Sequence, residues 1–128
     1  MGQEYLIDSN ILIGYLDNKL PENGMLFMHN IINNIPKLSV ITKIEILRFN
    51  TTEAAYKILE DFINVSIVYN LSSDVVEQTI ELCKFKKIKL PDAIIAATAI
   101  AKNMTLLTRN TSDFKSIADL KVINPFDL

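Results

Sequence analysis

Four acidic side chains are spaced along the chain so that one divalent cation could bind them. They are Asp8, Glu45, Asp92 and Asp113, and each follows an expected β-strand or opens the helix beside one. Carboxylates brought together repel one another, so a fold tolerates such a cluster best when a cation neutralises it. Oxygen ligands without His or Cys favour Mg²⁺ or Mn²⁺ over zinc. The pattern therefore predicts a metal-dependent nuclease site.

Each acid taken alone also has a helix-capping explanation. Asp8 lies between a strand and a helix, where it could be an N-cap. The run Thr42-Lys43-Ile44-Glu45 matches a capping box. Asp92 and Asp113 lie near helix starts, where the helix dipole favours negative charge. Capping does not require four acids to converge on one edge of a sheet, so their convergence favours the metal site.

Strands and helices alternate along the chain, and this order must position the acids. Apolar runs predict strands at residues 4–7, 38–41, 65–69, 105–108 and 121–123. Helical spacing predicts helices at residues 10–16, 25–35, 42 onward through 51–63, 72–85 and from 91, with a turn at 19–24 and a short helical turn around Phe114. This alternation predicts an α/β fold with a mainly parallel sheet of four to five strands. Such sheets bind ligands beyond the carboxyl ends of their strands, where the acids should gather.

Composition limits what the chain could be. A length of 128 residues, 49% of them hydrophobic, predicts a single domain over residues 1–128 with its own core. A net charge of −2 argues against a protein that holds nucleic acid by charge alone. The apolar run from Ala93 to Ala101 is too short to span a bilayer, and no signal peptide is evident, so we expect a cytoplasmic protein with no membrane partner. The single Cys83 excludes a disulfide framework and is expected to pack in the core.

Four motifs occur in order across nearly the whole chain. They are Leu6-Ile7-Asp8-Ser9-Asn10, Thr42-x-x-Glu45, Pro91-Asp92-Ala93-x-Ile95-Ala96-Ala97-Thr98-Ala99 and Leu107-Thr108-Arg109-Asn110-x-x-Asp113-Phe114. Together they resemble the PIN-domain ribonucleases of the VapC-like toxin family, which occur in type II toxin–antitoxin pairs. The resemblance implies a three-layer α/β/α PIN-like fold around the predicted sheet.

The resemblance also implies an activity and its residues. It makes Asp8, Glu45, Asp92 and Asp113 the catalytic and metal-binding acids, with Mg²⁺ or Mn²⁺ as cofactor. It makes Ser9, Thr108 and Asn110 polar neighbours that orient ligands or waters. The implied activity is an endoribonuclease toxin that cuts tRNA or rRNA and so inhibits translation. The implied partners are a cognate antitoxin, which presents an Arg or Lys to the acids, and a second copy of the chain, bound through residues 25–35 and 54–62.

Basic residues near the acids are candidates for RNA binding. Lys84, Lys86, Lys87 and Lys89 lie directly before Asp92, and Arg109 lies beside the last motif. Their role could be contact with substrate phosphates or simply solvation of a charged surface. The chain departs from many relatives at Arg48-Phe49-Asn50, where they carry a glycine, and this leaves open a different turn after the second acid.

Two other functions stay open at this point. One is a catalytically silent PIN-like module used for binding or assembly, although a scaffold gains nothing from a repelling acidic cluster. The other is a metal-dependent phosphoesterase that acts on DNA or another substrate. A comparison of RNA and DNA cleavage would separate this last alternative from the ribonuclease.

Overall fold

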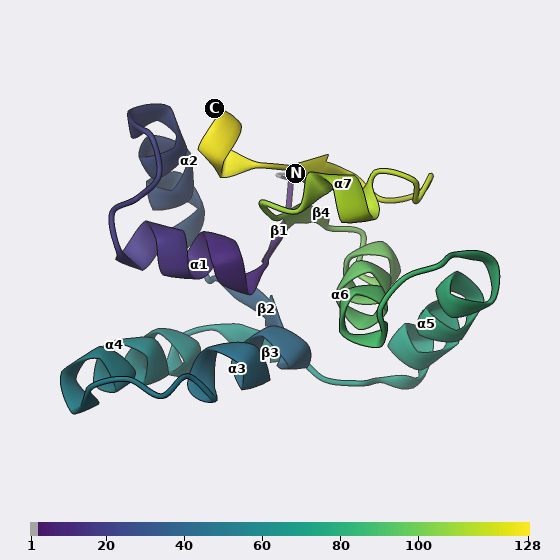
Figure 1. Cartoon of the computed structure of the whole chain (residues 1–128), viewed down its shortest axis with the longest axis horizontal. Coiled ribbons are helices and arrows are strands. Elements are labelled where there is room, and N and C mark those ends of the chain that lie inside the picture. Colours follow the sequence, from purple (N-terminus) through teal and green to yellow (C-terminus); the bar gives the residue numbers. More distant parts are fainter. Residues whose placement is uncertain (1–2) are drawn as a thin grey trace.

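Parallel strands run through the middle of the molecule in the computed structural model, which describes residues 3–128 (Figure 1). They are β1 (Tyr5–Ile7), β2 (Lys37–Ser39), β3 (Ile67–Tyr69), β4 (Thr105–Leu107) and β5 (Val122–Ile123). Hydrogen bonds join them in the orders β1-β4-β5 and β2-β3, and every pair is parallel. The predicted α/β class and parallel pairing are confirmed. The strands form two ladders, with β1 beside β2, rather than one continuous hydrogen-bonded sheet.

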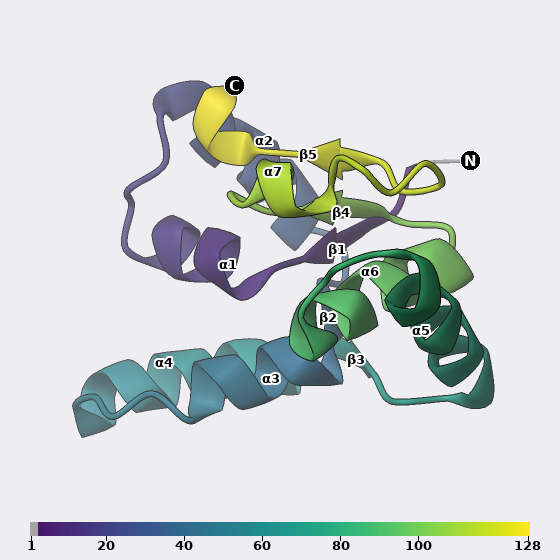
Figure 2. The ribbon, with the colours of Figure 1, turned by 45° about the vertical axis from the view of Figure 1, so that its right-hand side comes forward.

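Helices cover these strands on both sides. They are α1 (Ser9–Leu16), α2 (Glu22–Ile32), α3 (Val40–Leu47), α4 (Glu53–Asn64), α5 (Ser73–Phe85), α6 (Leu90–Ala101), α7 (Thr111–Phe114) and the 3₁₀ turn η1 (Pro125–Asp127). Helices α1 and α2 lie on one side of β1 and β4, and α5 and α6 on the other, while α3 and α4 run side by side away from β2 and β3 (Figures 1 and 2). None of the helices within residues 3–128 is both long and apolar enough to cross a bilayer.

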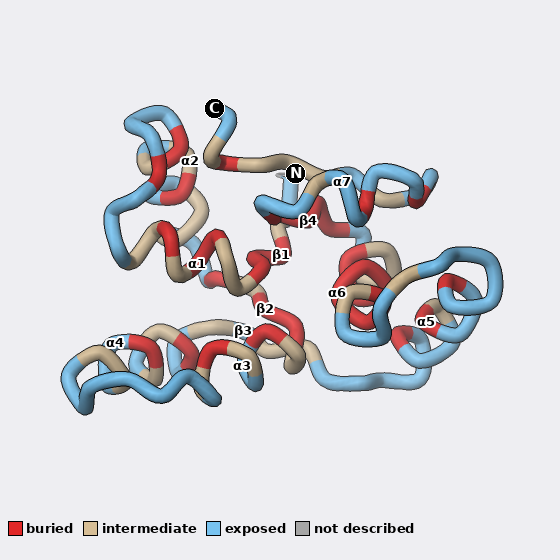
Figure 3. The backbone as a smooth tube through the Cα atoms, in the orientation of Figure 1, coloured by how far each residue is buried: buried red, intermediate tan, exposed pale blue. Residues whose placement is uncertain are grey.

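Alternate residues of the central strands pack into two separate cores. Leu6 and Leu106 pack with α6 and α5, whereas the next residues, Ile7 and Leu107, pack with α1 and α2. Both strands are therefore buried on both faces, as is typical of parallel sheets. Helix α6 is buried as well, as Figure 3 shows, and its residues 93–99 are all buried. This two-sided burial produces the predicted α/β/α layers.

Side-chain caps place several boundaries away from the predicted ones. The hydroxyl of Ser39 accepts a hydrogen bond from the Ile41 backbone N–H at 3.1 Å, so β2 ends and α3 begins two residues earlier than expected. The predicted capping box starting at Thr42 is therefore wrong. Thr52 caps α4 through the Ala55 N–H at 3.2 Å, which makes α3 and α4 separate helices. Helix α2 begins directly after Pro21, inside the turn predicted at residues 19–24.

Two glycines allow the C-terminal turn η1 to lie against α1 and α2. A Cβ atom on Gly14 of α1 would lie 2.7 Å from the Phe126 ring, closer than real Cβ contacts. A Cβ atom on Gly24 of α2 would overlap the carbonyl oxygen of Pro125 still more severely. The absence of side chains at these two helical positions thus leaves the space that Pro125 and the Phe126 ring occupy.

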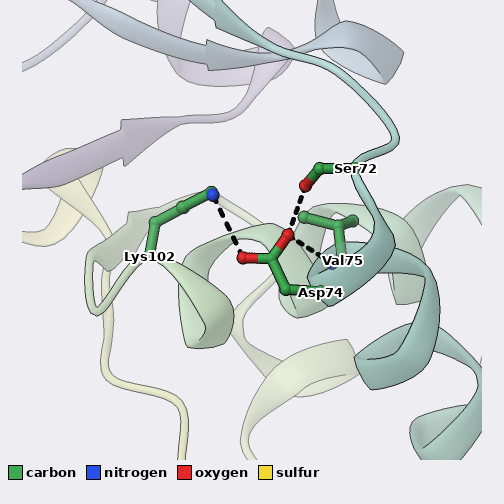
Figure 4. A network of polar contacts seen from close by, with 4 residues as sticks. All are labelled: Ser72, Asp74, Val75 and Lys102. Carbon is green, nitrogen blue, oxygen red and sulfur yellow. Dashed lines mark hydrogen bonds and ion pairs between the residues drawn. The ribbon is translucent and has the colours of Figure 1, made fainter.

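A polar network joins the start of α5 to the end of α6 (Figure 4). The Asp74 carboxylate accepts hydrogen bonds from the Ser72 hydroxyl, from the Val75 N–H at 3.0 Å and from Lys102 Nζ at 3.1 Å. These hydrogen bonds lower the pKa of Asp74 to about 2, and the bond from Ser72 has the largest effect.

Cys83 lies on the same helix α5 and is exposed. Its predicted place in the core is wrong, because Val75, Thr79 and Leu82 form the buried line.

Candidate active site

Asp8 connects the central strands to α1. Its backbone N–H donates to the Leu107 carbonyl at 2.9 Å, directly after the last pair of β1 and β4. Its carboxylate accepts from the Ser9 N–H at 2.8 Å and from the Thr108 hydroxyl at 2.7 Å. The residue is 6% exposed, and burial raises its pKa although both hydrogen bonds oppose that shift. Asp8 is thus an N-cap, as its capping explanation required, and also a buried carboxylate held in one orientation.

Glu45 reaches the same place from α3. The Ser9 hydroxyl donates to Glu45 Oε1 at 3.1 Å, so the residue after Asp8 contacts the second acid directly. The pKa of Glu45 is raised, first by burial and then by the charges of Asp8 and Asp92. Because Ser39 rather than Thr42 caps α3, Glu45 lies in the second turn of the helix and bonds across to α1.

Asp92 and Asp113 complete the group from the carboxyl-end side of the strands. Asp92 lies in the first turn of α6, and Asp113 is exposed on α7, which follows β4. The pKa of Asp92 is raised by burial, then by the charges of Asp8 and Asp113, while Lys89 opposes the shift. Each of the four acids therefore belongs to at least one repulsive charge pair. Positions that capping or the helix dipole explains one by one are thus linked by charge repulsion, from Asp8 and Asp92 to Glu45 and from Asp113 to Asp92.

No basic side chain neutralises this group by a direct ion pair within residues 3–128. The ion pairs found there are Lys37–Glu4, Lys57–Asp61 and Lys102–Asp74. Over the same residues, no three Asp, Glu, His or Cys side chains are already close enough to form a complete metal-binding cluster. The donor set nevertheless fits a hard divalent cation, because it consists of carboxylate oxygens that raise one another's pKa. Glu45 and Asp92 are only half-buried, which leaves them accessible to such an ion.

The predicted polar neighbours support the acids in different ways. The Ser9 hydroxyl contacts Glu45, and the fully buried Thr108 hydroxyl contacts Asp8. Asn110 acts through its backbone, since its N–H donates to Thr108 Oγ1 at 3.2 Å. Thr108 is therefore held between Asn110 and Asp8, and the conformation of the loop after β4 fixes the orientation of the Asp8 carboxylate.

The predicted basic residues do not all reach the acids. Lys89 is the N-cap residue of α6, and its charge acts on Asp92. Lys86 instead donates to the Ser116 carbonyl at 2.9 Å. Lys84 lies in the last turn of α5, and Lys87 is exposed in the following loop. Arg109 lies beside the site, with its guanidinium carbon 4.3 Å from the centroid of the Phe126 ring.

A pocket of about 1000 Å³ opens beside the acids. It shares Ser9 and Glu45 with them, and its remaining lining residues are Asn10, Ile13, Gly14, Asp17, Lys19, Arg48, Phe49, Asn50, Arg109 and Phe126. Sequence reasoning missed Phe126 as a part of this site, because nothing in a C-terminal Pro-Phe-Asp run marks it. Sequence reasoning also gave no sign that the fully buried Thr42 hydroxyl lacks a hydrogen-bond partner within the described part of the chain.

Comparison with known proteins identifies a family and similar solved structures. The PIN domain profile matches residues 5–120. A toxin–antitoxin complex from Klebsiella pneumoniae has a chain of similar structure, with 29% identity, a TM-score of 0.78 and coverage of 98% of this chain and 100% of that one. VapBC2 from Rickettsia felis, bound to a promoter DNA fragment, gives 24% identity, a TM-score of 0.78 and coverage of 95% and 98%. VapBC-1 from nontypeable Haemophilus influenzae has 22% identity and a TM-score of 0.78, with coverage of 96% of this chain and 98% of that one.

No curated protein sequence gives a significant match. The predicted likeness to VapC-like PIN-domain toxins is confirmed by the profile and by the similar solved structures. The profile spans most of the chain, and the protein belongs to the PIN-domain family.

Proposed function

We propose that the protein is a metal-dependent endoribonuclease, the toxin of a toxin–antitoxin pair, which cuts tRNA or rRNA in the cytoplasm and so inhibits translation. The observation that carries this proposal is the group of carboxyls at the carboxyl ends of β1 and β4. Asp8, Glu45 and Asp92 have raised pKa values, and no ion pair found within residues 3–128 includes them. Such a group costs stability in the free protein and becomes useful when a cation binds.

In this proposal each residue has a defined task. Asp8, Glu45, Asp92 and Asp113 would hold the cation, Mg²⁺ or Mn²⁺. When bound, that ion would supply positive charge that acidifies water and offsets the charge of the phosphate. Thr108 keeps Asp8 oriented through its 2.7 Å hydrogen bond, and Ser9 restrains Glu45. Arg109 and Lys89 would add positive charge where the negative RNA backbone approaches.

The proposed partners follow from the comparisons and from the exposed apolar residues. The similar structures include toxin–antitoxin complexes, so we expect an antitoxin to place an Arg or Lys against the uncompensated acids. We also expect a homodimer through the first half of the chain. Leu26 on α2 and Ile58 on α4 are 56% and 57% exposed, and a second copy would remove both from water.

The test incubates purified protein with total cellular RNA and Mn²⁺, with and without EDTA, and maps the ends of any products. Asp8→Ala and Asp92→Ala are tested beside the wild type, with Asp119→Ala as a control that removes an exposed acid at the other end of the strands. Hydrolysis by water would leave 5′-phosphate and 3′-hydroxyl ends. Discrete cuts that need Mn²⁺ and both acids would support the proposal.

Two results would contradict it. A folded, antitoxin-free wild type that cuts no RNA but hydrolyses DNA would indicate a different phosphoesterase. A protein that cuts neither, and whose stability does not respond to Mn²⁺, would indicate a silent PIN-like module.

A further inference from the structure

The pocket beside the acids combines features that suit a nucleotide. It is continuous with the acid group through Ser9 and Glu45, so a chain bound with one phosphate at the acids would extend directly into it. Its volume of about 1000 Å³ leaves ample room for a nucleoside. Its lining includes the cations Lys19, Arg48 and Arg109, the side-chain amides of Asn10 and Asn50, and the aromatic rings of Phe49 and Phe126.

Arg109 is held in place within this pocket before any ligand binds. Its backbone N–H donates to Asn10 Oδ1 at 3.1 Å, and its guanidinium lies over the Phe126 ring with the carbon 4.3 Å from the centroid. Gly14 leaves the space that the Phe126 ring occupies, since a Cβ atom there would lie 2.7 Å from the ring. Arg109 is an exposed residue, so a ligand in the pocket can reach it.

Phe49 provides a second stacking surface in the same pocket. Its side chain is 59% exposed, which is costly for an aromatic ring that has no partner to cover it. It lies in the Arg48-Phe49-Asn50 stretch that follows α3, and all three residues line the pocket. Arg48, Phe49 and Asn50 therefore place a cation, an aromatic ring and an amide on one wall of the pocket.

We propose that this pocket binds the base of the nucleotide next to the cut phosphate, with the Arg109–Phe126 pair as its stacking platform. The inference rests on the proposed ribonuclease function and names the subsite that selects the cut position. Proteins recognise unpaired RNA bases by stacking them on aromatic rings and on Arg guanidinium planes. The mixed amide and charged lining around the platform would then discriminate among base edges.

The test uses a short single-stranded RNA spanning a mapped cut, with fluorescent 2-aminopurine in place of the adjacent base. Binding is measured in EDTA, so that no cleavage occurs, and stacking is read as quenching of the 2-aminopurine fluorescence. Arg109→Ala should abolish the quenching and lower kcat/KM about 10- to 100-fold in Mn²⁺. Arg109→Lys keeps the charge but lacks the plane, and it should behave like Arg109→Ala.

The controls separate this proposal from the proposed function. Lys121→Ala removes one exposed cation just before β5, at the opposite end of the strands, and should quench and cleave like wild type. If Arg109→Lys matches wild type, Arg109 is only a phosphate contact and the stacking platform is refuted, while the nuclease stands. Normal quenching and kcat/KM in Arg109→Ala and Phe126→Leu would refute the subsite altogether. Failure of the wild type itself to cut RNA would refute the nuclease instead.

Discussion

Neutralising Asp92 should stabilise the metal-free protein while removing its activity. Its pKa is raised by burial and by the charges of Asp8 and Asp113, and Lys89 offsets only part of this. No hydrogen bond to the Asp92 side chain is present within residues 3–128, so Asp92→Asn removes repulsion without breaking a side-chain bond. Asp8 is a poorer choice for this test, because both of its carboxylate oxygens accept hydrogen bonds.

The size of the effect follows from partial exposure. Solvent screens each charge pair at such a half-buried position to about 0.2–1 kcal/mol. Two repulsions and one opposing attraction leave the equivalent of one pair, so the substitution should stabilise the fold by about 0.2–1 kcal/mol. An unfolding entropy of about 2.1 cal/mol/K per residue converts this stabilisation to a rise in Tm of about 1–4 °C. The measurement is thermal unfolding in EDTA, with Asp119→Asn as the matched control.

The stabilisation should also depend on pH in a defined direction. A carboxyl whose pKa is raised in the folded state binds more protons there than in the unfolded chain, so the fold loses stability as pH rises through the folded pKa. The advantage of Asp92→Asn over wild type should therefore be full at pH 8 and shrink as pH falls toward the usual aspartate value of 3.8. A variant that is less stable than wild type at pH 8 would refute the repulsive cluster and support a purely structural, dipole-favoured Asp92.

Three further outcomes are expected. Mn²⁺ should raise the Tm of the wild type, because an ion that binds only the native state stabilises that state. The rise should be far smaller in Asp92→Asn, and equal rises in the two proteins would show that Asp92 does not bind the ion. Thr42→Val should raise stability by about 1 kcal/mol in chemical denaturation, because it removes a buried hydroxyl without a partner, and a clear loss would show that the hydroxyl is bonded. Gly14→Ala should lower the free energy of unfolding by about 1–3 kcal/mol, because the new Cβ atom would displace the Phe126 ring. RNA cleavage should fall as well, since the ring supports Arg109. An unchanged Tm and activity would show that the ring can move without cost.

The order of the elements was predictable because their hydrophobic periods are strong. Residues 93–99 form an apolar run, and the structure buries all of them in α6 between α5 and the central strands. The parallel arrangement follows from the same alternation, and the PIN-domain likeness placed the acids on it. Boundaries were less predictable, because one side chain decides each of them. Ser39 ends β2 by capping α3. From the sequence alone, Thr42 is an equally suitable N-cap for the same helix.

The supporting contacts of the site depend on long-range packing that local patterns do not encode. Ser9 could be named from its motif, but its bond to Glu45 depends on the packing of α1 against α3. Phe126 belongs to no motif, and its place beside Arg109 depends on two glycines more than a hundred residues away in sequence. Cys83 was misplaced because two apolar lines run along α5, and the sequence does not show which one faces α6.

The bond between Asp8 and Thr108 joins residues that are 100 positions apart in the sequence, and β1 pairs with β4 over the same separation. A ribosome that adds about 5–20 residues per second needs about 5–20 s to pass from one to the other. During that time Asp8 has been made, but the strand and the hydroxyl that fix it do not yet exist. An incomplete chain therefore lacks the contacts that orient Asp8, and the group of acids is complete only after nearly all of the chain has been synthesised.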